Sequence, residues 1–376
     1  MAIEISVEAL KECFADLPDP RVVERTSHSL GDILFLTLCA VICGMDDWES
    51  IEVWGELRLD WLRRFVALEN GIPSHDTIAR VFAALDSKRF QASFLTWMST
   101  LCPSLEGQIV AIDGKTARGS YDRRLGKRAI HMVSAFVCGH GITLGQWKTE
   151  EKSNEITAIP ELLEALDLKG ATVTLDAMGC QKDIAQAIMG KGANYVLGLK
   201  GNQGTLSQRV KEFFDQAQWR NYESFPTWGA RSQESGHGRT DTRRCVALPC
   251  DGWEGIEAWA GLKSVVMIES ARQTDQGVSS EKRYYISSLE PNSKKLAHTI
   301  RSHWEIENRL HWCLDVTFGE DANRTRKDHA PENLNIIRKM TMNILRLSPI
   351  KRSIVKKRLR ASLSNDYLAE IMGLAP

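Results

Sequence analysis

Apolar positions in the first hundred residues recur at helical spacing, and no run there has the alternation of a strand. Within this region, a Gly-Ile-Pro break precedes Ser74, a candidate helix N-cap, and an apolar face follows it: Ile78, Val81, Phe82 and Leu85. That helix fits a packed bundle and the recognition helix of a helix-turn-helix equally well. Residues 1–100 are therefore expected to form a small all-helical domain, with a role in DNA recognition left open.

From about residue 105 the pattern changes to short runs rich in β-branched residues. These runs predict strands at 109–113, 132–138, 142–147, 171–176 and 194–199. Amphipathic stretches at 153–166 and 181–190 predict helices on either side of the fourth strand, and the GHG at 139–141 predicts a hairpin turn. Hairpin strands joined to β-α-β units imply an α/β fold, a mixed sheet flanked by helices.

The remaining pattern divides into three parts. Residues 203–292 contain several glycines, four tryptophans and strand-like pieces, which favours a mostly β insertion. Residues 293–316 read as one long helix with charged and aromatic positions interleaved. The predicted organisation is a helical domain over 1–100, a catalytic core over 105–202 interrupted by the insertion 203–292 and completed by helices over 293–345, and a basic C-terminal region over 346–376.

Charge and cysteine content narrow the class of protein. The 376 residues include 48 basic and 48 acidic ones, so any nucleic-acid surface must be local. The stretch 335–360 has nine Lys or Arg and no Asp or Glu, which favours a DNA-binding helix pair over a merely solvated face. Nine cysteines form no CxxC pair, which is typical of a reducing compartment. No signal peptide or membrane-spanning stretch is apparent, and we expect a cytoplasmic protein with no membrane partner.

Two aspartates each stand at the end of a predicted buried strand, shortly before a glycine. Asp113 ends a buried run before Gly114, and Asp176 ends another shortly before Gly179. One such aspartate is most simply explained as the cap of a turn. Two of them, at the ends of strands in one sheet, are expected to meet at the same edge. Close carboxylates either share a proton or bind a cation, and oxygen ligands suit Mg²⁺.

A third carboxylate is expected from the long helix, where Glu305, Glu307 and Asp315 are the candidates. On an α-helix Glu307 shares the apolar face, whereas Glu305 lies on the side of Arg301 and Arg309. We therefore predict Glu307 as the site residue and a surface ion pair for Glu305. A zinc site made of His303, His311 and Cys313 is disfavoured, because no CxxC completes it.

Long ordered motifs carry a family resemblance: AIDGKTARGS, TLDAMGCQ, YVLGLKGNQ, GHGRTDTR and HWEIENRLHWCLDVTFGEDANRTR. Together they resemble the DDE transposases of bacterial insertion sequences, in the group of the H-repeat-associated proteins of Rhs elements. The resemblance implies a ribonuclease-H-like core and a catalytic, metal-binding triad of Asp113, Asp176 and Glu307. It also implies two Mg²⁺ or Mn²⁺ ions, double-stranded DNA at element ends and at the target as partner, and a homodimer assembled on DNA.

The implied reaction is metal-dependent phosphodiester hydrolysis and strand transfer, and local basic residues are its candidate DNA contacts. These are Lys115, Arg118, Arg123, Arg124, Lys127 and Arg128 after the first aspartate, Lys200 and Asn202 after the strand at 194–199, and Arg239, Arg301 and Arg309.

The chain departs from the family at some positions. Ile300, His303 and Leu314 occupy the places of the family's tyrosine, arginine and lysine around the glutamate, and Asp241 stands where a glutamate is expected. Two alternatives therefore remain: a catalytically impaired DNA-binding remnant of a transposase, and a ribonuclease-H-like nuclease.

Overall fold

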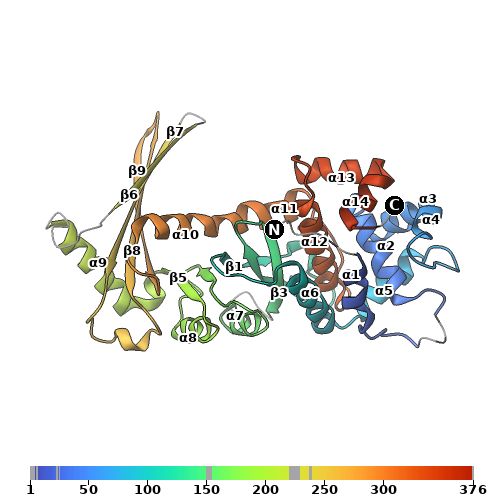
Figure 1. The fold of residues 1–376 in the computed structure, drawn as a ribbon, viewed down its shortest axis with the longest axis horizontal. Coiled ribbons are helices and arrows are strands. Elements are labelled where there is room, and N and C mark those ends of the chain that lie inside the picture. Colours follow the sequence, from blue (N-terminus) through green and yellow to red (C-terminus); the bar gives the residue numbers. More distant parts are fainter. Residues whose placement is uncertain are drawn as a thin grey trace.

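The computed structural model describes residues 5, 7–22, 24, 26–149, 155–219, 229–236 and 239–374. The molecule is elongated, as Figure 1 shows: the first and last helices of the chain lie together at one end, and a group of long strands lies at the other. A long helix, α10 (Ser293–Glu305), runs lengthwise between the two ends. Position 154 and its neighbours, where the start of the helix over 153–166 was expected, lie outside the described residues.

Helices form the first part of the chain, as the sequence predicts. They are α1 (Val7–Ala15), α2 (Leu30–Ile42), α3 (Trp48–Leu57), α4 (Leu59–Leu62), α5 (His75–Ala84) and α6 (Ser87–Leu101), and the described residues before Ile109 contain no strand. The side chain of Ser74 caps α5 by accepting the Thr77 N–H. The apolar face of α5 is buried, and Asn333 donates 2.8 Å hydrogen bonds to the carbonyls of Phe82 and Leu85. The helix is thus packed in a bundle, and a role in DNA recognition stays a prediction.

A mixed sheet follows, in the order expected for a ribonuclease-H-like core. Its strands are β1 (Ile109–Thr116), β2 (His131–Val137), β3 (Ile142–Thr149), β4 (Thr172–Leu175) and β5 (Asn194–Leu199), with α7 (Glu155–Glu164) and α8 (Lys182–Gly190) between the later ones. The order is β3-β2-β1-β4-β5, with β1 to β3 antiparallel and β1, β4 and β5 parallel. The predicted α/β class, the hairpin and the flanking helices are confirmed.

One strand is longer than its sequence predicts. The strand β1 was expected to end at Asp113, with a turn at Gly114, but it continues to Thr116. The extra residues pair with the start of β2, since Gly114 lies opposite Val133 and Thr116 opposite His131. Asp113 therefore stands within a strand, and the turn-cap explanation of this residue is wrong.

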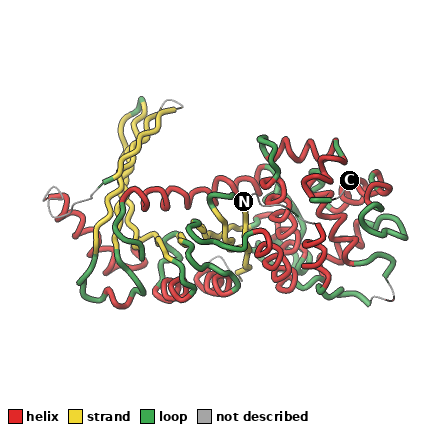
Figure 2. The backbone as a smooth tube through the Cα atoms, viewed as in Figure 1, coloured by secondary structure: helices red, strands yellow, loops and turns green. Residues whose placement is uncertain are grey.

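The insertion does not begin as a β structure. Its first described element is a helix, α9 (Gly204–Trp219), which buries Ser207, Val210, Phe214 and Ala217 at helical spacing. Only then come β6 (Ala230–Gly236), β7 (Arg239–Pro249), β8 (Ser264–Thr274) and β9 (Gly277–Ser287). Because β9 pairs antiparallel with β5, these four strands extend the core sheet to nine strands within the described residues (Figure 2).

The predicted long helix over 293–316 is present as one continuous rod. It consists of α10, a π-helical segment over Ile306–His311 and α11 (Trp312–Val316). The chain then ends in α12 (Ala330–Leu347), α13 (Ile354–Leu363) and α14 (Asn365–Met372). None of the described helices is both long enough and apolar enough to cross a membrane.

The basic stretch 335–360 is not a free basic face. Arg338, Lys339, Lys357 and Arg358 are buried. Lys357 donates to the Leu345 carbonyl at 2.7 Å, and Arg358 donates to the Val41 carbonyl at 2.9 Å and pairs with Asp46 at 2.7 Å. The interpretation of this stretch as a DNA-binding helix pair is wrong for these four side chains, because they are buried. Lys339, Lys357 and Arg358 serve as internal hydrogen-bond donors. Lys351, Arg352, Lys356 and Arg360 remain exposed.

Candidate active site at the edge of the sheet

Two neighbouring parallel strands bring Asp113 and Asp176 to the same level. In the register of β1 and β4, Ile112 lies opposite Leu175, so each aspartate is the next residue on its chain. Asp176 Oδ1 accepts the backbone N–H groups of Met178, at 2.8 Å, and Gly179, at 3.3 Å. The turn after β4 thus orients one carboxylate, while β1 carries the other.

The helical rod crosses these two strands and is fastened to both by histidines. His303 Nδ1 lies 2.9 Å from Thr174 Oγ1 on β4, and His311 Nδ1 lies 3.5 Å from Asp113 Oδ2 on β1. Burial lowers the pKa of His303 to about 4 and that of His311 to about 3, so both rings are neutral at neutral pH. Glu307 lies midway between these two anchors along the chain.

The two glutamates of the rod differ in their ion pairing, and the ion pair predicted for Glu305 is present. Its carboxylate pairs with Arg309 at 2.6 Å, four residues later on the same rod. Glu307, in contrast, is exposed and has no ion-pair partner among the described residues. Burial raises the pKa of Glu307, Arg283 opposes the shift, and the charge of Asp176 adds to it. Glu307 therefore lies close enough to Asp176 for their charges to interact.

The pKa of Asp113 is raised further than that of Glu307, mainly by burial. Burial raises the pKa of this residue to about 7, and the charges of Glu155, Asp176 and Glu307 act in the same direction. Within the described part of the chain, no Lys or Arg forms an ion pair with Asp113, Asp176 or Glu307. No three His, Cys, Asp or Glu side chains there lie close enough to hold one metal ion together. The carboxylates interact, but they do not form a closed ligand set.

The sequence did not predict a buried histidine–glutamate pair beside Asp113. His131 Nε2 lies 2.5 Å from Glu155 Oε1, and Thr116 Oγ1 lies 2.8 Å from the other ring nitrogen of His131. A Cβ atom at Gly114 would collide with both His131 and Glu155, so this glycine provides space and does not form a turn. The spacing of His131 and Glu155 along the chain did not indicate this pair, because the two residues come together only when the sheet forms.

The two histidine anchors were also missed as such. The sequence showed His303 and His311 eight residues apart, favoured histidine packing around the glutamate helix over zinc, and placed His303 where the family has an arginine, but it did not indicate which strands the two rings contact. In the structure each ring contacts a different strand, and no zinc-like group of ligands occurs among the described residues. The spacing that could have indicated their role is the interval of four residues from each histidine to Glu307.

The expected basic loop is exposed. Between β1 and β2 the chain turns back through a bridge from Asp122 to Lys127, and the outer side chains of this turn are exposed: Arg123, Arg124, Lys127 and Arg128. Arg118 has 82% of its side chain exposed and lies 3.5 Å from Asp321. Lys200 is exposed as well.

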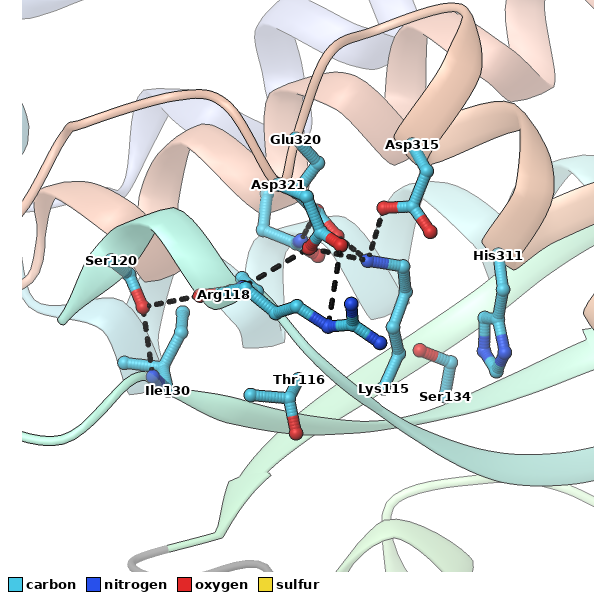
Figure 3. A network of polar contacts seen from close by, with 12 residues as sticks. Lys115, Thr116, Arg118, Ser120, Ile130, Ser134, His311, Asp315, Glu320 and Asp321 are labelled. Carbon is cyan, nitrogen blue, oxygen red and sulfur yellow. Dashed lines mark hydrogen bonds and ion pairs between the residues drawn. The ribbon is translucent and has the colours of Figure 1, made fainter.

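Two of the residues expected to contact DNA bind other groups of the protein instead. Lys115 is only 11% exposed and lies among the carboxylates of Asp315, Glu320 and Asp321 (Figure 3). Its assignment as a phosphate contact is wrong, because the ammonium group already forms ion pairs with three carboxylates. The amide of Asn202 donates to the Ala177 carbonyl at 2.6 Å and thereby supports the turn that follows Asp176.

Arg239 and Arg301 line a groove between the insertion strands and α10. The groove has a volume of about 910 Å³ and, among the described residues, seven basic and three acidic side chains line it. The acids are paired: Arg301 lies 3.2 Å from Glu234, and Arg239 lies 3.5 Å from Asp241. The groove is therefore basic on balance, and its lining includes Asn308, the chain neighbour of Glu307.

Comparison with known proteins agrees with this arrangement. Residues 11–98 match the family described as DDE_Tnp_1-associated, and residues 104–344 match the family described as Transposase DDE domain. YncI of Escherichia coli O157:H7, named as a candidate transposase, is 46% identical over 98% of this chain and 95% of its own length. YhhI of Escherichia coli K12, named as an H repeat-associated candidate transposase, is 41% identical over 98% of both chains.

A likeness among solved structures is more distant. A piggyBac transposase, in a synaptic complex with hairpin DNA, shares 12% identity and a TM-score of 0.44, over 98% of this chain and 77% of that one. The assignment rests on the sequence matches, which span both the helical part and the sheet. By these matches, the chain belongs to the family of DDE transposases.

Proposed function

We propose that this chain is a DNA transposase that cleaves a phosphodiester and joins the freed strand to target DNA, with Asp113, Asp176 and Glu307 as its catalytic triad. One observation carries this proposal. Two aspartates stand level on parallel strands, and a helix fastened to both strands presents a third carboxylate between its two anchors. No Lys or Arg of the described residues forms an ion pair with these acids, so the excess negative charge calls for an external cation.

The donor set suits a hard divalent cation. Carboxylate oxygens are the ligands of Mg²⁺ and Mn²⁺, and the pKa of Asp113 is raised first by burial and then by the nearby acidic charges, both of which a bound cation would offset. Bound by Asp113, Asp176 and Glu307, one or two such ions would supply Lewis-acid stabilisation of an in-line displacement at phosphorus. The three carboxylates do not form a closed set in this structure, so binding a shared ion would require Glu307 to approach the aspartates. Its π-helical segment is the place for that adjustment, since such segments recur at functional sites.

The neighbouring side chains of this site hold the carboxylates in place. His303 fixes the rod on β4 and His311 fixes it on β1, and both do so as neutral rings that add no charge. The backbone N–H groups of Met178 and Gly179 hold one oxygen of Asp176 and leave its other oxygen available.

We place the DNA along the two basic surfaces on either side of the acids. The loop with Arg123, Arg124, Lys127 and Arg128 lies on one side, and the groove with Arg239 and Arg301 lies on the other. Basic surfaces that flank an acidic centre bind phosphates without neutralising the ligands themselves. Duplex DNA at the element ends and at the target is the proposed partner, with two copies of the chain assembled on it.

A catalytically impaired remnant is the second candidate, and His303 favours it. The family has an arginine at this place, but His303 is buried and bonded to Thr174, so it does not replace a phosphate-binding guanidinium. Arg301 and Arg309 are half-exposed, and each is paired with a glutamate of the chain itself. A remnant would bind element ends and leave them intact.

The test is a nicking assay on oligonucleotides that carry the inverted repeats flanking the coding sequence, with Mg²⁺ or Mn²⁺. The wild type is expected to cut at the repeat ends, and Asp113→Asn and Asp176→Asn are expected to lose cutting by orders of magnitude while they keep metal-free DNA binding. Binding without cutting by the wild type would support the remnant. Cutting of any duplex, independent of the repeats and without strand joining, would support a ribonuclease-H-like nuclease.

A further inference from the structure

Lys115 is an internal cation at the junction of β1 and the end of the rod. Its ammonium lies 2.7 Å from Asp315 Oδ1, 2.6 Å from Glu320 Oε2 and 3.5 Å from Asp321 Oδ1 (Figure 3). Lys115 is two residues after Asp113, so both side chains leave the same face of the strand. The lysine therefore faces the rod, as Asp113 does.

Two successive contacts connect this strand face to the rod. Asp113 meets His311, and Lys115 meets Asp315, which follows His311 by four residues. Steps of two along a strand and of four along a helix are both repeats on one face. Glu307 lies about one turn before His311 within the π-helical segment, so the two contacts together set the position of that turn relative to Asp113.

The same ammonium also holds the chain that leaves the rod. Glu320 is 2% exposed and accepts a hydrogen bond from Asn335 of α12. Asp321 accepts the backbone N–H of Arg118 at 3.1 Å. The end of the rod, the following turn and the segment after β1 thus meet at Lys115.

We propose that Lys115 is a positioning residue: through Asp315 it fixes the register of the rod against β1, so that Glu307 is held within reach of Asp113 and Asp176. This inference rests on the proposed function of those three carboxylates. Lys115 touches neither DNA nor metal in this role.

A simpler role makes a different prediction. Glu320 is buried and needs a counter-charge, and Lys115 provides one whether or not it reaches Asp315. If that were its whole role, the loss of Asp315, whose side chain is 37% exposed, would leave the site unchanged. The variant Asp315→Asn separates the two roles, since it removes the charge that ties the rod to the ammonium while Lys115 keeps Glu320 and Asp321.

The experiment compares Asp315→Asn, Lys115→Arg and the wild type without DNA. The matched control is Lys148→Met, which removes an ion pair with buried Glu332 between β3 and α12, away from the rod. Three quantities are measured: the melting temperature, hydrogen exchange over residues 306–316, and Mn²⁺ affinity by electron paramagnetic resonance.

We expect Asp315→Asn to melt close to the wild type, to exchange faster over 306–316 and to bind Mn²⁺ about 10- to 100-fold more weakly, the usual effect of losing a residue that orients metal ligands. Lys115→Arg should keep all three properties. Lys148→Met should melt lower with unchanged exchange over 306–316 and unchanged Mn²⁺ affinity.

Wild-type exchange and wild-type Mn²⁺ affinity in Asp315→Asn would overturn the positioning role. The proposed function fails on a different result. If the wild type binds no Mn²⁺, or if Asp113→Asn binds Mn²⁺ as the wild type does, the triad is not a metal site. In that case the exchange measurement alone decides whether Lys115 sets the register of the rod.

Discussion

Asp113 is the residue whose surroundings most constrain its chemistry. It stands within β1, beside the neutral ring of His311, and the charges of Glu155, Asp176 and Glu307 act on it. Such a carboxylate is unfavourable as an anion in the isolated protein and favourable once a cation is bound. The cost of charging it should therefore appear in the stability of the metal-free protein.

The pH dependence of melting should reveal this cost. The pKa of Asp113 is raised from 3.8 to about 7. Between those values the folded state keeps a proton that the unfolded chain has released, so wild-type stability falls as the pH rises from about 4 to about 7 and stays lowered above it. Asp113→Asn removes this loss. In EDTA, the variant should melt above the wild type at pH 8, with a gap that narrows toward pH 5. Parallel melting curves across this range would show that the pKa of Asp113 is not raised in the folded protein.

Gly114 gives a second test at this site. A methyl group there would collide with His131 and Glu155, so Gly114→Ala should lower the free energy of unfolding by about 1–3 kcal/mol, the usual cost of overpacking. Urea denaturation measures the change. Gly139→Ala is the control, since its Cβ would come no nearer than 3.4 Å to Gln108 and should change stability by less than about 0.5 kcal/mol. Equal effects of the two changes would remove the special role of Gly114.

The rod formed by α10, the π-helical segment and α11 is the element that completes the site. Its position follows from contacts with two strands, and its wide π turn contains Glu307. The sequence predicted the extent of this helix and the ion pair of Glu305, because both follow from local spacing. It did not predict the π turn or the role of His303, because these depend on how the rod meets the sheet.

The basic loop between β1 and β2 is the element on which DNA binding is tested. Arg123→Ala with Arg124→Ala should weaken binding to duplex DNA and flatten its salt dependence by about 0.9 in slope for each lost phosphate contact. Fluorescence anisotropy at several salt concentrations gives that slope. Lys169→Ala with Lys211→Ala removes the same charge from exposed positions elsewhere. Identical slopes for the two double variants would make the loop an ordinary solvated turn.

At the scale of the molecule, one hydrophobic core joins parts that the sequence divides. A single cluster of buried side chains extends from α2 and α5 through β1 and β4 to α12. Arg358 adds a polar link, since it binds Val41, Asp46 and Thr317. The charge pattern of 335–360 suggested DNA binding because sequence alone does not show which lysines and arginines face inward. The boundary near residue 100 remains a prediction.

Calorimetry tests whether that boundary separates independent units. With a continuous core, the helical part and the sheet should unfold in one transition. Arg358→Met leaves Asp46 without its partner and should lower the melting temperature of the whole transition. Two resolved transitions, of which only one responds to Arg358→Met, would show that the helical part and the sheet are independent domains.

The central claim is that Glu307, and not Glu305, completes a metal-dependent DNA-cleaving site with Asp113 and Asp176. The most direct measurement compares nicking of repeat-end DNA in Mg²⁺ by Glu307→Gln and Glu305→Gln, two changes of equal size on one rod. Glu307→Gln should lose cleavage by orders of magnitude, and Glu305→Gln should keep it, since it gives up only an ion pair with Arg309. Full cleavage by Glu307→Gln, or its loss only in Glu305→Gln, would contradict this assignment of the site.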